Sequence, residues 1–191
     1  MPALATFATD CRHRFGGLAL AVLVATLPRA NAQAPALEET VEAAYLYKFP
    51  GFVDWPSDAF KSPASPIVIG LAGAPKVLDE LARISRGRLV LGRPVETRAI
   101  VGGELPRDLN VLFIGRGASA DVGRLVAEAR RAHWLVVTDL PDGLKDGAAL
   151  DFVEIDGRLR FEASPPAAQQ AGIKLSSKLL SVAAKVVEET P

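Results

Sequence analysis

Three short and almost purely apolar segments constrain the fold of this chain more than any other feature. They span residues 66–72, 110–114 and 135–138. Segments without polar alternation are typical of strands buried on both faces, as in parallel sheets covered by helices. Residues 75–84 and 118–131, which lie between them, carry apolar side chains at helical spacing. The alternation predicts a parallel α/β sheet.

A further helix is predicted before this core, over residues 38–49. Its apolar positions recur at steps of three and four residues, which indicates one inward face. Strand material is also expected around residues 93–98, within the stretch 89–100. The predicted inward face of the first helix consists of Val41, Ala44, Tyr45, Lys48, Phe49 and Phe52.

The C-terminal third departs from the alternating pattern. Residues 149–155 and 158–163 resemble two strands joined at Asp156-Gly157, a pair that tolerates the positive φ angles of a tight hairpin turn. Ser164 is expected to cap a helix, Gly172 to interrupt it, and a second helix to run from 174 to about 187. We therefore predict a three-layer α/β fold with a mostly parallel sheet, an antiparallel hairpin at the sheet edge and closing helices.

The first 34 residues have the layout of a secretory signal peptide. A positive segment (Arg12, Arg14) precedes an uncharged run of 13 residues, 15–27, and a small-residue stretch ending at Ala34. A membrane anchor is the alternative, but a spanning helix needs about 20 apolar residues. We predict cleavage after Ala32, with Ala34 as the second choice. Residues 1–32 are then the signal peptide and residues 33–191 a single exported, periplasmic α/β domain.

Composition argues against several functional classes. The only cysteine lies in the predicted leader, and His133 is the one histidine beyond it, so neither a transition-metal site nor a Cys–His pair is expected. We interpret His133 as a structural residue near a helix C-terminus. The formal net charge is zero, which gives no indication of nucleic-acid binding. No catalytic residue and no cofactor is predicted.

One glycine motif leaves two interpretations open. Residues 115–120 fit G-x-G-x-x-A after a predicted strand, and Asp139 follows the next strand. This layout is that of a phosphate-binding turn, with Gly115, Gly117 and Asp139 as its key residues and a nucleotide or another small molecule as the ligand. The alternative is that a strand-to-helix turn in this fold favours glycine for backbone reasons alone.

Aromatic side chains gather at the end of the first predicted helix. Tyr45 and Phe49 fall on the predicted inward face, where stripes at helical spacing are usually core. Tyr47, Phe52 and Trp55 need not all follow that face. They form our candidate partner-binding surface, because exposed aromatic residues supply much of the energy of protein interfaces.

The ordered set of short phrases in this chain resembles the YfiR-like family of periplasmic regulators. The resemblance extends over residues from about 40 to 185. The phrases are 43–49 (AAYLYKF), Trp55-Pro56, 67–73, 92–95 (GRPV), 112–115 (LFIG), 135–139, Phe152, 157–161 (GRLRF) and 171–180 (AGIKLSSKLL).

The resemblance implies a regulatory function. It implies a single α/β domain that often forms a homodimer. In the best-known case of the family, this domain restrains a membrane-anchored diguanylate cyclase by contacting its periplasmic part, which lowers cyclic-di-GMP and reduces biofilm. A membrane-anchored sensor kinase is the alternative partner. Two departures matter. The chain has no cysteine beyond the leader, so the redox-sensitive disulfides of some relatives are not implied, and Ala163-Ser164 replaces the family's usual Ile-Asn.

Export gives the first testable prediction. Protein recovered from the periplasm should begin at Gln33, or at Pro35 if the second cleavage site is used. N-terminal sequencing measures this directly, and an intact Met1 in that fraction would contradict the predicted leader.

Overall fold

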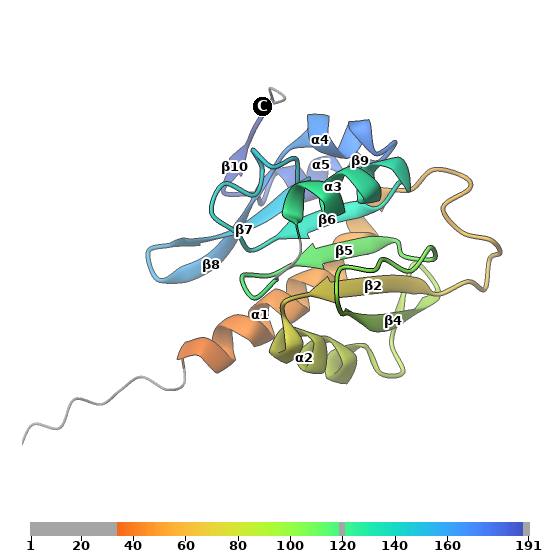
Figure 1. Ribbon diagram of the computed structural model, residues 1–191, viewed down its shortest axis with the longest axis horizontal. Helices are drawn as coiled ribbons and strands as arrows, with labels where there is room; N and C mark the ends of the chain where they lie inside the picture. The colour runs from red at the N-terminus through yellow and green to blue at the C-terminus, as the bar shows by residue number, and fades with distance from the viewer. Residues whose placement is uncertain (1–33, 119–120, 189–191) are drawn as a thin grey trace, which may run out of the picture. The chain divides into compact units, whose positions relative to one another are not determined.

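An eight-stranded sheet organises the part of the chain that the structure describes, residues 34–118 and 121–188 of a computed structural model (Figure 1). The strand order is β10-β8-β7-β6-β5-β2-β4-β3, and β1 pairs with β9 in a separate two-stranded sheet. The predicted leader lies outside the described residues. The strands are β1 Val53–Asp54, β2 Ile67–Ala72, β3 Leu89–Val90, β4 Arg93–Ile100, β5 Val111–Ile114, β6 Leu135–Thr138, β7 Leu150–Ile155, β8 Arg158–Ala163, β9 Lys174–Leu175 and β10 Lys185–Val186.

The centre of the sheet confirms the three buried parallel strands. Strand β5 lies between β2 and β6, with Val111 paired to Ile69 on one side and to Leu135 on the other. These three side chains are fully buried. A strand hydrogen-bonded on both edges and covered on both faces has no exposed position for a polar side chain, which explains the uninterrupted apolar runs.

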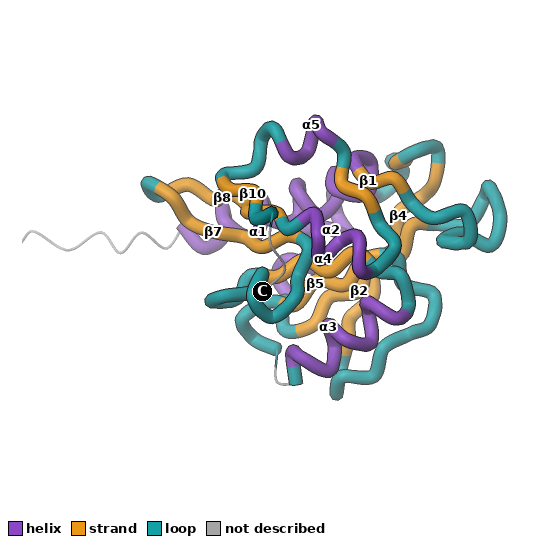
Figure 2. The backbone as a smooth tube through the Cα atoms, turned by 90° about the horizontal axis from the view of Figure 1, so that it is seen from above, coloured by secondary structure: helices purple, strands orange, loops and turns teal. Residues whose placement is uncertain are grey.

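Helices cover both faces of this sheet, as the predicted three layers require. The helices are α1 Ala34–Lys48, the 3-10 turn η1 Phe49–Phe52, α2 Pro75–Ser85, α3 Val122–Arg131, α4 Pro165–Gln170 and α5 Ser177–Leu180. Leu46 of α1 and Leu81 of α2 pack with Ile69 in one core. Leu125 of α3 packs with Leu112 in a second core on the opposite face. Figures 1 and 2 show α3 apart from α1 and α2. Among the described residues, no helix is both long and apolar enough to cross a membrane.

The inward face of α1 differs from the predicted stripe. The buried residues of α1 are Glu42, Ala43 and Leu46, whereas Lys48 is exposed. Phe49, the first residue of η1, is buried as predicted. Of the other predicted positions, Val41, Ala44 and Tyr45 are partly buried and Phe52 is exposed. The helix packs against both the sheet and α2, so the face that it buries is rotated relative to the predicted one.

The hairpin is confirmed, but its position and the closing helices need correction. Asp156 and Gly157 have φ angles of 52° and 68°, as the tight turn requires. The hairpin does not form the sheet edge, because β10 pairs with β8 outside it. In place of a helix from 174 to 187, the chain forms β9, the short α5 and β10. The segment is extended there because β9 pairs with β1 and β10 pairs with β8. These pairings satisfy backbone groups of β1 and β8 that would otherwise lack partners.

Ser164 caps α4 as predicted. Its hydroxyl accepts a hydrogen bond from the Ala167 amide at 3.3 Å, and the residue is completely buried. Pro165 occupies the first turn, where its missing amide proton costs nothing. Gly172, with a φ of 70°, follows the end of the helix.

Replacing Ser164 by alanine should lower the free energy of unfolding by about 1–2 kcal/mol, because it leaves the buried Ala167 amide without its acceptor. Chemical denaturation measures this change. Ser177→Ala, an exposed serine at the start of α5, is the matched control and should change stability by less than about 0.5 kcal/mol. Equal effects of the two substitutions would contradict the capping role.

Candidate functional site

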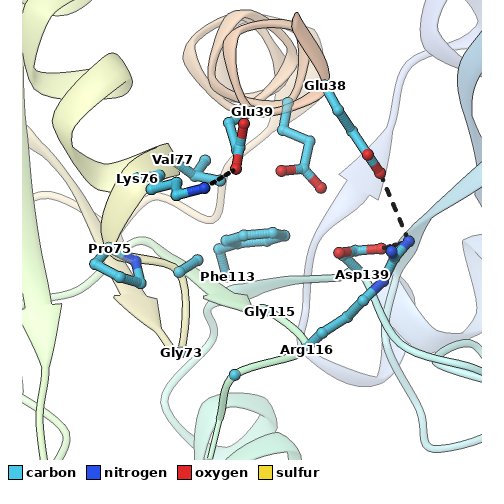
Figure 3. A pocket seen from close by; sticks show the side chains of 13 residues that line it. Glu38, Glu39, Gly73, Pro75, Lys76, Val77, Phe113, Gly115, Arg116 and Asp139 are labelled. Carbon is cyan, nitrogen blue, oxygen red and sulfur yellow. Dashed lines mark hydrogen bonds and ion pairs between the residues drawn. The ribbon is translucent and has the colours of Figure 1, made fainter. Parts of the chain in front are cut away.

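A cavity of about 270 Å³ opens where three parallel strands end (Figure 3). Gly73 follows β2, Gly115 follows β5 and Asp139 follows β6, and all three line the cavity. Glutamates near the start of α1 line its other side. The carboxyl ends of parallel strands are where ligands bind in open α/β sheets, so this position is a candidate site by its topology.

Two strand-to-helix turns touch at the base of this cavity. A Cβ atom on Gly117 would lie 2.6 Å from the Gly73 carbonyl oxygen, and one on Gly115 would lie 2.9 Å from the Ala74 Cβ. The amide of Gly117 donates to the Gly73 carbonyl at 3.1 Å, and that of Gly115 donates to the Ala72 carbonyl at 2.9 Å. The glycines therefore serve the close approach of the two turns.

The structure brings the predicted residues Gly115, Gly117 and Asp139 together but provides little for a phosphate. The two glycine amides are occupied, as described above. Helix α3 begins at Val122, not at residue 118 as predicted, and the Asp121 carboxylate caps it by accepting from the Arg124 amide at 3.1 Å. A carboxylate already occupies the helix N-terminus that would attract a phosphate.

Ion pairs join the walls of the cavity. Arg116 Nη2 lies 2.8 Å from Asp139 Oδ1 and 3.7 Å from Glu38 Oε1. Lys76 Nζ lies 3.2 Å from Glu39 Oε1. Figure 3 shows Arg116 extending to Asp139 below Glu38, so that the loop after β5 is linked to both α1 and the loop after β6. The two cations that line the cavity are thus each paired with a carboxylate.

Glu42 is the unexpected member of the site. Its residue exposure is only 4%, and its Oε1 atom is buried without a hydrogen-bond partner. Burial raises the pKa of Glu42 to about 8, and the charges of Asp139 and Glu38 add to the shift. Sequence reasoning missed this residue because the predicted stripe placed Val41 inward. The one feature of the sequence that could have indicated Glu42 is an acidic residue directly beside that stripe.

The aromatic candidates lie around η1, at the other end of α1. The Tyr47 hydroxyl donates to the Leu89 carbonyl at 3.2 Å, and Trp55 Nε1 donates to the Pro50 carbonyl at 3.1 Å. Both side chains are partly buried, whereas Phe52 is 38% exposed. Leu89, on the short edge strand β3, is 61% exposed. We call Tyr47, Phe52, Trp55 and Leu89 the edge patch.

His133 is bound to the backbone of another segment. Its Nδ1 atom lies 2.9 Å from the Ala171 carbonyl oxygen, and its own φ is 61°. Within residues 34–118 and 121–188, no three His, Cys, Asp or Glu side chains are grouped so that they could hold a metal ion.

Comparison with known proteins gives one family match and several structural ones. A family model described as YfiR/HmsC-like matches residues 39–184. No curated protein matches the chain significantly. The ABC domain from Streptococcus pneumonia, solved in complex with L-Trp, aligns with a TM-score of 0.51 at 9% identity. A conserved domain protein from Vibrio cholerae O1 biovar El Tor strain N16961 aligns with a TM-score of 0.54 at 12% identity.

The structural matches concern the fold alone. Each alignment covers 78% of this chain but 60% of the other chain, so this chain spans less than two thirds of either structure's length. At identities this low, common architecture says nothing about shared ligands or activity.

The burial of Glu42 predicts a pH-dependent stability. The native protein holds the Glu42 proton up to about pH 8, whereas the unfolded chain releases it near the usual value of 4.5. The native state therefore binds more protons between these values, and stability falls as pH rises, by at most about 1.4 kcal/mol per pH unit for one proton. Glu42→Gln should flatten the decline between pH 6 and 8.

Chemical denaturation at a series of pH values measures this effect. Asp151, whose pKa burial raises from 3.8 to about 6, should contribute the same decline at lower pH in both proteins. Glu128→Gln, which changes a partly exposed acid of α3 outside the cavity, is the matched control and should follow the wild type. Parallel curves for wild type and Glu42→Gln would contradict the assignment.

Proposed function

The chain belongs to the YfiR/HmsC-like family, and from this membership we propose that it is a periplasmic, non-enzymatic regulator that restrains a membrane-anchored signalling protein. A diguanylate cyclase is the first choice of partner, and a sensor kinase is the second. Restraint of a cyclase lowers cyclic-di-GMP and surface attachment. We further propose that the regulator forms a homodimer and needs no cofactor.

The edge patch is the observation that supports this function best. Phe52 of η1 and Leu89 of the two-residue edge strand β3 expose apolar side chains at 38% and 61%. Aromatic side chains held in place by hydrogen bonds lose little conformational freedom on binding. Tyr47 and Trp55 are held in this way through Leu89 and Pro50. Such a surface suits the periplasmic part of a protein partner.

A second candidate function is the binding of a small ligand near the Gly115–Gly117 turn. The cavity there is the observation that favours it, because it combines apolar walls with a buried and unpartnered carboxyl group. The two functions are compatible, since a regulator can bind its input at a site apart from its partner.

Phe52→Ala tests the proposed surface. The side chain is exposed, so the melting temperature should stay within a few degrees of wild type, while binding to the partner's periplasmic domain should weaken by about 2 kcal/mol or more. In a deletion strain, the wild-type gene should lower cyclic-di-GMP and attachment, and the Phe52→Ala gene should not. Thermal melts, a pull-down of the partner and cyclic-di-GMP assays measure the three effects.

Val101→Ala is the matched control, because Val101 is an apolar residue with 80% exposure that lies outside the edge patch. It should leave stability, binding and cyclic-di-GMP unchanged. A deletion that does not alter cyclic-di-GMP would contradict restraint of a cyclase. A Phe52→Ala protein that binds and restrains like wild type would instead place the contact elsewhere.

A further inference from the structure

We propose that the cavity at the ends of β2, β5 and β6 is a binding site for a small organic ammonium ion, whose charged head group pairs with Glu42. The inference is independent of the proposed signalling partner, because it rests only on the groups that line this cavity. It differs from the phosphate site that the glycine motif suggests, since it assigns the opposite charge to the ligand.

Four carboxyl groups and only two cations line the cavity. Asp139 and Glu38 share Arg116, and Glu39 pairs with Lys76. The remaining carboxyl group belongs to Glu42. A cation that enters the cavity therefore meets one carboxyl group without a partner, whereas a phosphate meets an excess of negative charge.

Because Glu42 is buried, the lack of a partner for its carboxyl group costs free energy. Its Oε1 atom is buried and accepts no hydrogen bond from the described residues, although buried carboxyl groups are normally hydrogen-bonded. Its position on α1 is fixed, because the neighbouring Ala43 and Leu46 are completely buried. The carboxyl group consequently faces the cavity without having to reorganise, which reduces the cost of binding.

The rest of the cavity suits a short apolar body attached to the ammonium group. Val77, Phe113 and Ala74 contribute to its walls, and Figure 3 shows Val77 beside Lys76 and Phe113 between Lys76 and Asp139. A volume of about 270 Å³ lies just below the usual range for drug-sized ligands. The site therefore matches a small aliphatic or aromatic amine better than a nucleotide.

Binding of a cation should displace the Glu42 proton. At neutral pH this carboxyl group keeps its proton in the free protein, since burial raises its pKa to about 8. An ammonium ion favours the charged carboxylate, so binding and proton release are coupled and affinity increases as pH rises toward 9. The other charged groups that face Glu42 are Glu38 and Glu39 of α1, Lys76 of α2, Arg116 and Asp139.

Calorimetric titration of the mature protein with three four-carbon compounds tests the proposal. Butylamine, 1-butanol and butyrate share one apolar chain and differ in the charge of the head group. Butylamine should bind at least about tenfold more tightly than the other two, since only its charge is complementary to the carboxylate. Its affinity should rise between pH 6 and 9, and the heat should vary with the ionisation enthalpy of the buffer.

Two variants assign the binding to Glu42. Glu42→Gln keeps the shape of the side chain and should weaken butylamine binding at least about tenfold. Glu128→Gln removes an acid outside the cavity and should leave it unchanged. In the wild-type protein, the dependence of butylamine affinity on pH and the dependence of the binding heat on the buffer test the same coupling without any variant. The proposal is overturned if butylamine does not bind, which would mean that the cavity holds only water. It is also overturned if butyrate or inorganic phosphate binds more tightly than butylamine.

Discussion

The contact between two strand-to-helix turns is the constraint on which the candidate site of this protein depends. Parallel pairing of β2 with β5 delivers Gly73 and Gly117 to the same point, where the Gly117 amide bonds the Gly73 carbonyl at 3.1 Å. A Cβ atom on Gly73 would lie 1.9 Å from the Ala118 amide nitrogen, and the φ of Gly73 is 67°. Glycine is therefore required there by both space and backbone conformation. This contact forms the floor of the cavity and holds Arg116 at its rim.

The sequence predicts those parts of the fold whose burial is determined locally. The run 111–114 has no polar residue to place at a solvent-exposed position, so β5 could be predicted without knowledge of its neighbours. Strands β9 and β10 have two residues each, and their conformation depends on distant partners. Leu175 pairs with Val53, and Val186 with Ala163, contacts that helical periodicity in the same stretch cannot reveal.

The same distinction applies to the candidate site. Three of the site residues follow predicted strands: Gly115, Gly117 and Asp139. Topology alone therefore brings them together at the carboxyl ends of the parallel strands. The chemical character of the site comes from α1, because Glu42 and Glu38 make the surroundings acidic. Which residues α1 turns inward is decided by its packing on two sides, against the sheet and against α2. A motif located the site, but its charge could be assigned only from the folded structure.

One continuous segment links the cavity and the proposed edge patch. Glu42 lies in the cavity near the middle of α1, and the same helix leads through Tyr47 into η1 and Phe52 of the edge patch. Between them, Leu46 and Phe49 are buried in the core, and Phe49 stacks against Tyr45 with ring centroids 5.6 Å apart. Well-packed elements of this kind move as units, because interiors are close-packed and do not deform continuously. A ligand that acts on partner binding would therefore have to act through the packing of α1 as a whole.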